Sequence, residues 1–277
     1  MTISDYRKFF ASINSYPKKS LGQNYLIDKN ILHKIGEIAE LNSDDLVIEV
    51  GTGFGFLTSF LAERVKKVIS VEKDKAVFEH MLPKFATYKN AQLINKDALK
   101  VDFKEIVGQD TFKFISNLPY SVASQIIFSL LKCYGSFTSL VIMVQKEMGE
   151  RICSAPDSKQ YGAFSVVVQS YFDTEIKNTV SPNSFWPKPE VDSVIIKMTP
   201  RKEKIVNDSD RMLFNEIVKK SFQTRRKKLI NNLKSILDQK ALLKIFEELK
   251  LNPNIRAEQL SLDNYVTLTT AIKTNLV

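Results

Sequence analysis

The sequence predicts an α/β protein in which a doubly wound parallel sheet precedes a small all-helical domain. Short apolar runs, typical of buried parallel strands, alternate with helical patterns up to Gln145. A glycine-rich turn, Gly51–Gly55, directly follows the first strong strand pattern. After about residue 200 strand patterns cease and only helical ones remain. We therefore expect one domain over residues 1–200 and a helical domain over residues 201–277.

Each expected strand of the first domain is short and apolar. The parallel strands are Leu46–Val50, Val68–Val71, Gln92–Asn95, a run from Phe112, and Leu140–Gln145. The helices between them are Ile31–Leu41 (capped by Asp28), Phe56–Glu63, Ala76–Phe85 and Ser124–Lys132. Val166–Tyr171 and Val194–Met198 have no long helix between them, which predicts an antiparallel pair at one edge. Residues 1–20 are polar and basic and are expected to be largely irregular, and the second domain takes helices at Leu213–Leu233, Ala241–Leu249 and Leu262–Lys273.

The charge balance favours a polyanionic partner. The chain has 277 residues, a formal net charge of +9 and a pI of about 9.3, which suits nucleic acid or a membrane surface. Its two cysteines, Cys133 and Cys153, are far apart with no histidine nearby, so neither a disulfide framework nor a metal site is expected. Met1–Tyr16 lacks the apolar stretch of a signal peptide, and no apolar run approaches membrane-spanning length. We expect a cytoplasmic protein.

Three strand ends carry residues suited to a single ligand. The glycine spacing is Gly51-x-Gly53-x-Gly55, which differs from the G-x-G-x-x-G of dinucleotide-binding proteins. Glu72 ends the second strand, where a carboxylate can accept hydrogen bonds from both hydroxyls of a ribose. Asp97 ends the third strand, where it can accept from an adenine amino group. The order and spacing favour S-adenosylmethionine over NAD as the cofactor.

A fourth strand ends at Asn117-Leu118-Pro119-Tyr120. Pro119 donates no hydrogen bond and keeps Leu118 out of the helical region, so the chain leaves the strand as a fixed extended turn. That turn presents an amide, free carbonyl groups and an aromatic ring at the carboxyl end of the strand. The motif resembles that of methyltransferases that modify an exocyclic amine.

The order of several motifs is similar to that of KsgA-type small-subunit rRNA adenine dimethyltransferases, the ribosomal RNA adenine dimethylase family. The matching segments are Gly22–Leu26, Glu49–Gly55, Val71–Asp74, Asp97–Leu99, Asn117–Tyr120 and Phe185–Ser193, the last resembling the F-x-P-x-P-x-V-x-S loop. The resemblance implies a Rossmann-like class I S-adenosylmethionine-dependent methyltransferase domain with a small helical C-terminal domain. It implies dimethylation of N6 on two adjacent adenosines near the 3′ end of small-subunit (16S) rRNA, in ribosome biogenesis. The implied cofactor-binding residues are Asn24, Leu26, Gly51, Gly53, Glu72, Asp97 and Asn117.

The target of such an enzyme is an adenine amino group, whose lone pair is delocalised into the ring. Catalysis therefore needs acceptors that hold the N–H bonds of this group. Asn117 and a backbone carbonyl of Leu118 or Pro119 are the expected acceptors, while Tyr120 and Phe185 are expected to stack on the two faces of the base. No strong general base is required. The chain departs from the family at Tyr25, where Phe is usual, and at Trp186.

A basic run in the second domain is the expected RNA contact. The basic residues are Lys219, Lys220, Arg225, Arg226, Lys227 and Lys228, with Lys234 beyond. On a helix they would spread around more than one face, which favours phosphate contacts over a solvated stripe. The expected partner is the small ribosomal subunit, bound by a monomer.

Two other functions fit parts of the sequence. One is a large-subunit rRNA adenine methylase of the macrolide-resistance type, against which Leu118 and the proline-rich loop weigh. The other is a non-catalytic ribosome assembly factor, against which the intact Asn117–Tyr120, Glu72 and Asp97 weigh.

Overall fold

The chain divides into two compact units in the computed structural model, which describes residues 3–13, 16–18 and 22–276. The first unit is Met1–Gly149 with Glu175–Pro200, and the second is Glu150–Thr174 with Arg201–Val277. The sequence prediction drew a single boundary near residue 200. The second unit thus also contains Glu150–Thr174, which the prediction assigned to the first domain.

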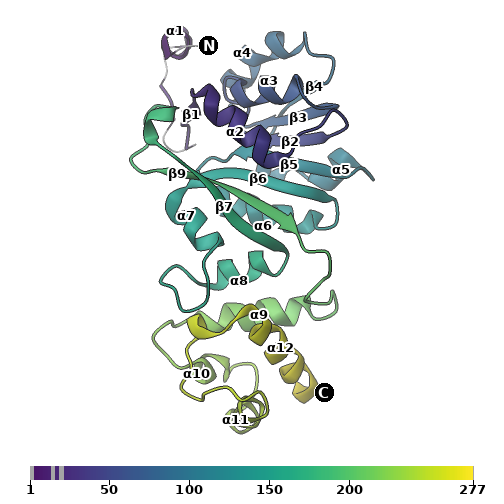
Figure 1. The fold of residues 1–277 in the computed structure, drawn as a ribbon, viewed down its shortest axis with the longest axis vertical. Helices are drawn as coiled ribbons and strands as arrows, with labels where there is room; N and C mark the ends of the chain where they lie inside the picture. The colour runs from purple at the N-terminus through teal and green to yellow at the C-terminus, as the bar shows by residue number, and fades with distance from the viewer. Residues whose placement is uncertain (1–2, 14–15, 19–21, 277) are drawn as a thin grey trace. The chain divides into compact units, whose positions relative to one another are not determined.

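A twisted sheet forms the centre of the first unit (Figure 1). Among the described residues it has seven strands in the order β4-β3-β2-β5-β6-β9-β7. Their bounds are β2 Leu46–Val50, β3 Lys67–Glu72, β4 Ala91–Asn95, β5 Phe112–Asn117, β6 Phe137–Gln145, β7 Phe172–Val180 and β9 Ser193–Pro200. The strands from β2 to β6 are parallel, and β9 runs antiparallel to β6. The predicted doubly wound sheet is confirmed, and its order reverses between β2 and β5, where ligands bind in such sheets.

Helices cover both faces of this sheet (Figure 1). Their bounds are α2 Lys29–Ala39, α3 Phe56–Ala62, α4 Lys75–Phe85, α5 Phe103–Val107, α6 Ala123–Leu130 and α7 Lys146–Ile152. On β5, Ile115 packs in one core cluster with α2 and α3, while the neighbouring Phe114 lies beside Phe103 of α5. Asp28 caps α2 as predicted, because its carboxylate accepts from the Asn30 N–H at 3.0 Å.

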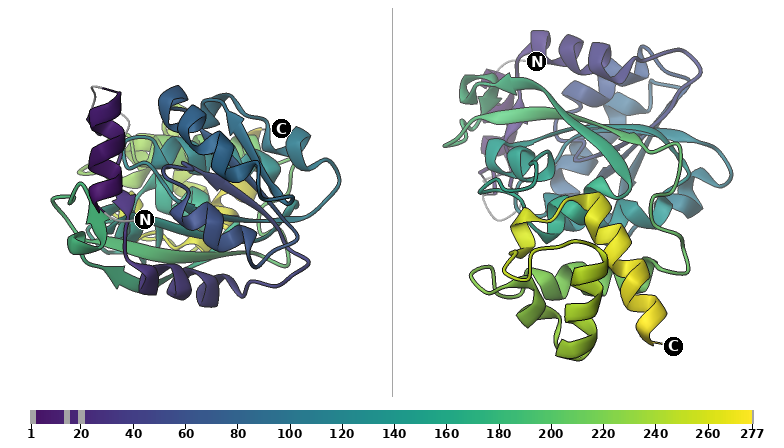
Figure 2. Two further views of the ribbon diagram at one scale, coloured as in Figure 1. Left: turned by 90° about the horizontal axis from the view of Figure 1, so that it is seen from above. Right: turned by 60° about the horizontal axis from the view of Figure 1, so that its bottom comes forward.

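The expectation that residues 1–20 are irregular is wrong for α1, Ile3–Ser12. This helix buries Tyr6, Phe9 and Phe10, which share an aromatic cluster with Tyr25, Phe54 and Trp186. In the left view of Figure 2, α1 is the dark purple helix. The three aromatic residues are spaced i, i+3, i+4, so one helical face carries them all. Burial of that face stabilises a helix that composition alone did not suggest.

The predicted strand at Val166–Tyr171 is also wrong, because Ala163–Gln169 forms helix α8. An apolar run of this length fits a buried helix as well as a strand, and here Ser165 caps the helix by accepting from the Gly162 N–H at 3.1 Å. The strand that lies next to β9 is instead β7. A second, two-stranded sheet pairs β1, Tyr25–Leu26, with β8, Phe185–Trp186. It brings two of the sequence motifs together, with Leu26 opposite Phe185.

The second unit is helical (Figure 2). Besides α8 it contains α9 Arg211–Ser221, α10 Leu229–Leu233, α11 Gln239–Glu248 and α12 Leu262–Leu276. Short 3-10 turns occur in both units: at Ala98–Lys100, Leu131–Cys133 and Pro182–Ser184 in the first, and at Ala257–Gln259 in the second. Two hydrogen bonds join the two segments of this unit, Glu150–Thr174 and Arg201–Val277. The Asp157 N–H donates to the Glu258 carbonyl (2.7 Å), and the Tyr161 hydroxyl donates to the Leu260 carbonyl (3.1 Å). Within the described ranges, no helix is both long and apolar enough to cross a membrane.

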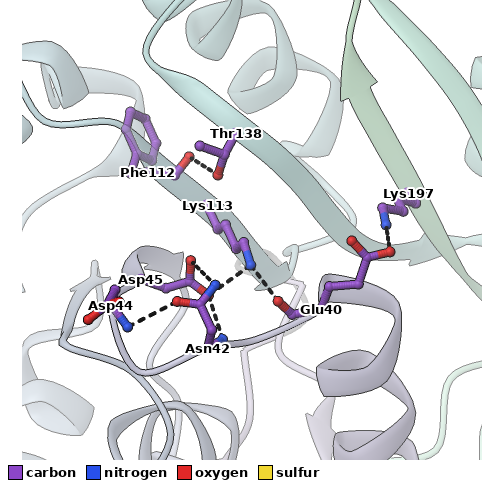
Figure 3. A network of polar contacts seen from close by, with 8 residues as sticks. All are labelled: Glu40, Asn42, Asp44, Asp45, Phe112, Lys113, Thr138 and Lys197. Atoms are coloured by element: carbon purple, nitrogen blue, oxygen red, sulfur yellow. Dashed lines mark hydrogen bonds and ion pairs between the residues drawn. The ribbon is translucent and has the colours of Figure 1, made fainter.

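A polar network closes the amino-terminal edge of the sheet in the first unit (Figure 3). The Lys113 side chain on β5 is nearly buried, donates to the Glu40 carbonyl at 2.6 Å and pairs with the Asp45 carboxylate at 2.8 Å. Asn42 donates to the same carboxylate through its backbone N–H at 2.8 Å. Lys197 of β9 pairs with the exposed carboxylate of Glu40. These contacts hold the end of α2 and the start of β2 against β5.

Candidate active site

A cavity of about 140 Å³ opens at the carboxyl edge of the sheet in the first unit. All the predicted cofactor-binding residues line it, as do the three residues after Asn117. These are Asn24, Leu26, Gly51, Gly53, Glu72, Asp97 and Asn117, with Leu118, Pro119 and Tyr120. The structure therefore brings together segments that are widely separated in the sequence, from β1 to the turn after β5.

The glycine turn needs glycine for its backbone and for its close packing. Gly53 has φ +51°, and a Cβ there would lie 3.0 Å from the Tyr25 ring. At Gly55, with φ +69°, a Cβ would lie 2.4 Å from the Phe85 ring. The turn is also fastened to β3, because the Gly53 N–H donates to the Glu72 carboxylate at 2.9 Å.

Glu72 and Asp97 provide carboxylates at the ends of two neighbouring strands. Glu72 also accepts from the Asp74 N–H at 2.8 Å, and burial raises its pKa above the ordinary value. Asp97 pairs with Lys73 at 2.8 Å, and that hydrogen bond lowers the pKa of Asp97. Each carboxylate oxygen has more than one acceptor direction, so both groups retain capacity for a ligand.

Glu49 is a buried carboxyl group of the cavity wall that sequence reasoning did not single out. Its Oε2 accepts from Thr58 at 2.5 Å and from Ser70 at 2.7 Å, and Ser70 in turn contacts the Thr52 hydroxyl at 2.6 Å. Burial raises the pKa of Glu49 to about 8, so the group is largely neutral at pH 7. The network therefore braces the glycine turn without adding a full negative charge.

The two polar atoms of the Asn117 side-chain amide differ in their contacts. Its Nδ2 donates to the Asn24 carbonyl at 3.1 Å, which fixes the orientation of the amide. Its Oδ1 is buried and has no hydrogen-bond partner among the described residues. A buried acceptor without a donor costs about 1–3 kcal/mol. The geometry therefore suits a ligand that brings an N–H group to this oxygen.

The two predicted stacking residues have different environments. Tyr120 lines the cavity, and its hydroxyl lies 2.6 Å from the Ser193 Oγ. Phe185 is only 3% exposed, pairs with β1 and packs in the core cluster with Leu26 and Ile35. Phe185 is thus not among the described residues that line the cavity, and its stacking on the base stays a prediction.

Tyr6 is a cavity residue that the sequence analysis missed. Its ring stacks on Tyr25 and Trp186 with centroids 5.6 and 5.5 Å away, and its hydroxyl donates to the Leu26 carbonyl at 3.4 Å. Helix α1 thereby supplies part of the cavity wall. The aromatic spacing of Tyr6, Phe9 and Phe10 was the signal that could have revealed it.

Tyr25→Phe is expected to stabilise the cofactor-free protein by about 1 kcal/mol, because the Tyr25 hydroxyl is buried with no partner among the described residues. The substitution keeps the ring that packs against Gly53 and introduces the family's usual residue. Urea unfolding of the two proteins measures the difference. A loss of stability would show that the hydroxyl has a favourable contact. Tyr6→Phe, whose hydroxyl does have a partner, is the matched control and is expected to lose stability slightly.

The predicted basic run is interrupted in the second unit. Lys219 and Lys220 lie in the last turn of α9, whereas residues 225–228 lie in the turn between α9 and α10. The expected continuous helix over Leu213–Leu233 is therefore wrong. Asn232 stabilises the break by donating to the carbonyls of Ser221 and Thr224 at 2.6 and 3.1 Å. The Arg225 guanidinium donates to the carbonyls of Lys159 and Tyr161 within the same unit, so it has a structural role.

Comparisons with known proteins agree with this arrangement. A family model for ribosomal RNA adenine dimethylase matches residues 14–274. The chain is 43% identical over 265 residues to the ribosomal RNA small subunit methyltransferase A of Clostridium botulinum (strain ATCC 19397 / Type A), which covers 94% of this chain and 96% of the relative. The protein of the same name from Clostridium perfringens (strain SM101 / Type A) is 43% identical over 256 residues, 92% of this chain and 90% of the relative.

Two solved structures are similar along most of the chain. A dimethyladenosine transferase from Plasmodium falciparum has a TM-score of 0.79 at 25% identity, covering 91% of this chain and 98% of that one. The 23S rRNA methyltransferase ErmE has a TM-score of 0.73 at 21% identity, covering 90% of this chain and 100% of that one. The likeness to ErmE shows a shared fold.

Proposed function

Because the chain belongs to the ribosomal RNA adenine dimethylase family, we propose that it transfers two methyl groups from S-adenosylmethionine to N6 of each of two adjacent adenosines near the 3′ end of small-subunit rRNA. The curated relatives at 43% identity carry the small-subunit name. The large-subunit methylase is similar at only 21% identity and supports the class I methyltransferase fold alone. The small subunit is accordingly the proposed partner, with a cytoplasmic monomer as the acting form.

The Oδ1 of Asn117 has no hydrogen-bond partner among the described residues, and this observation supports the chemistry most directly. An adenine amino group is a poor nucleophile because its lone pair is delocalised into the ring. Acceptors that hold its two N–H bonds favour a pyramidal nitrogen with the lone pair directed at the methyl group. Asn117 offers one such acceptor. The Pro119 carbonyl already accepts from the Val122 N–H at 3.2 Å, so we assign the second acceptor to the Leu118 carbonyl.

The remaining cavity residues fit the cofactor. Glu72, Asp97 and the Gly51–Gly53 turn line the same cavity. In the proposed complex Glu72 accepts from the ribose hydroxyls, Asp97 accepts from the adenine amino group, and the turn allows close approach of the backbone. When bound, S-adenosylmethionine supplies an electrophilic methyl group on a sulfonium ion. Tyr120 stacks on the target base and limits its tilt. The methylated nitrogen becomes acidic and loses its proton to water, so no side chain needs to act as a strong base.

The basic residues of the second unit are proposed to contact rRNA phosphates. Arg226→Glu combined with Lys227→Glu is expected to weaken binding to undermethylated small subunits by at least tenfold and to reduce its salt dependence, with cofactor affinity unchanged. Both side chains are exposed, and unlike Arg225 neither makes a hydrogen bond or ion pair with the described residues. Filter binding at several salt concentrations measures the effect.

The control for this charge reversal is Lys240→Glu combined with Lys250→Glu, which makes the same change in net charge elsewhere on the second unit. Equal weakening by both pairs would show a general charge effect and no localised contact. Loss of cofactor binding in the first pair would indicate misfolding.

Methyl transfer from labelled S-adenosylmethionine to undermethylated small subunits, with large-subunit rRNA in parallel, tests the function as a whole. Dimethyladenosine in the small-subunit RNA alone is the expected product after digestion and mass analysis. Label in the large-subunit RNA would identify a resistance-type methylase. Cofactor binding without transfer to either RNA would identify a non-catalytic assembly factor.

A further inference from the structure

We propose that Ser193 is a positioning residue that holds the Tyr120 ring in the orientation needed to stack on the target adenine. The inference rests on the proposed function, in which Tyr120 contacts the base. Ser193 is the last residue of the proline-rich segment Phe185–Ser193. Through its contact with Tyr120, which lines the cavity, Ser193 connects this segment to the site.

The contact between the two residues is short and its serine side is rigid. The Tyr120 and Ser193 hydroxyl oxygens lie 2.6 Å apart, and Ser193 is 0% exposed. Ser193 begins β9 and lies opposite Gln145 of β6. Lys146, which follows Gln145, donates its N–H to the carbonyl of Asp192, the residue before Ser193, at 3.0 Å. The hydroxyl of Ser193 therefore occupies a point fixed by the sheet ladder.

The backbone that leads into Tyr120 is fixed to the neighbouring strand, β6. The Leu118 N–H donates to the carbonyl of Met143 on β6 at 3.0 Å, and Pro119 restrains the backbone that leads into Tyr120. The ring is thus anchored through its backbone near Met143 and through its hydroxyl near Gln145. With both ends held, rotation about the side-chain bonds is restricted before any base arrives.

Such preorganisation matters because a misplacement of about 1 Å can cost a large factor in rate. Without the Ser193 hydroxyl, the half-buried Tyr120 hydroxyl would lose this hydrogen bond. The ring would then rotate so that the hydroxyl could hydrogen-bond to water. Burial raises the pKa of Tyr120, so the phenol remains neutral and able to share this hydrogen bond. The expected consequence is a slower chemical step with cofactor binding intact.

A double-mutant cycle of Ser193→Ala, Tyr120→Phe and the two combined tests the inference. Single-turnover methylation of small subunits is measured at saturating cofactor, together with the cofactor dissociation constant and the urea unfolding midpoint. Each single variant is expected to lose about tenfold in rate, as for a single lost hydrogen bond. The double variant is expected to be no slower than either, because all three remove the same interaction. Ser193→Thr keeps a hydroxyl and is expected to recover at least half of the wild-type rate.

Independent, multiplying losses in the double variant would overturn the inference, as would a Ser193→Ala enzyme with the wild-type rate. A lowered unfolding midpoint with an unchanged rate would show a purely structural serine and would overturn it too. Tyr120→Ala separates this result from failure of the proposed function. If Tyr120→Ala is inactive while Ser193→Ala is fully active, the stacking role of Tyr120 stands and the positioning role of Ser193 is refuted. If Tyr120→Ala is fully active, both are refuted.

Discussion

Asn117→Ala is expected to lower the rate of methyl transfer by about 10²–10³-fold, with at most a few-fold change in the affinity for S-adenosylmethionine. The reason is that the Oδ1 of Asn117 is already oriented by the Nδ2 contact with Asn24 and has no competing donor among the described residues. Alanine removes the acceptor without placing anything in its position. Single-turnover methylation of undermethylated small subunits and calorimetric titration of the cofactor measure the two quantities separately.

Asn117→Asp is the matched control for this prediction. It keeps an acceptor of the same size but loses the donation to the Asn24 carbonyl, so we expect a rate between those of the wild-type and alanine proteins. A near-native rate in the alanine variant would refute the assigned role of Asn117. A parallel fall in cofactor affinity and rate would instead indicate that Asn117 acts mainly by holding the cofactor.

Lys113→Met is expected to reduce the free energy of unfolding by about 3 kcal/mol, since removal of one partner leaves a buried charge uncompensated. Asp45 and the Glu40 carbonyl would each lose the donor supplied by the Lys113 ammonium (Figure 3). Methionine retains most of the side-chain volume, so the change isolates the charge from packing. Urea unfolding followed by circular dichroism measures the loss.

Lys197→Met provides a control within the same network. Its partner Glu40 has a carboxylate side chain that is 76% exposed, and exposed pairs contribute about 0–1 kcal/mol. Equal destabilisation by both variants would contradict the importance of burial at Lys113. The cavity lies at the other edge of the sheet, so folded Lys113→Met protein is expected to retain its methylation rate.

Sequence patterns predicted the residues of the cavity because each sits at a place that the strand pattern defines. Gly51, Glu72, Asp97 and Asn117 all end or follow apolar runs, and parallel strands bring such ends to one edge. The turn at Pro119 could also be predicted, because proline restricts its own backbone and that of the preceding residue.

The errors occurred where distant contacts decide the structure. Residues 3–12 form a helix because Tyr6 and its neighbours find aromatic partners in Phe54 and Trp186, which lie far along the chain. The burial of Phe185 follows from the pairing of β8 with β1, which local sequence does not reveal either, although its predicted role at the base is a separate matter. Val166–Tyr171 was assigned as a strand because its apolar run lacks a diagnostic period. In each case tertiary packing overrides local preference.

The helical unit has a consequence for the protein while it is still on the ribosome that makes it. Glu150–Thr174 is synthesised before β9, yet its partners around Glu258 and Leu260 come near the end of the chain. Until α9 emerges, the buried apolar side chains of α8, among them Phe164 and Val168, lack the helix of their own unit that packs against them. Nascent chains that stall after residue 200 would therefore expose an aggregation-prone surface and are the form most in need of a chaperone.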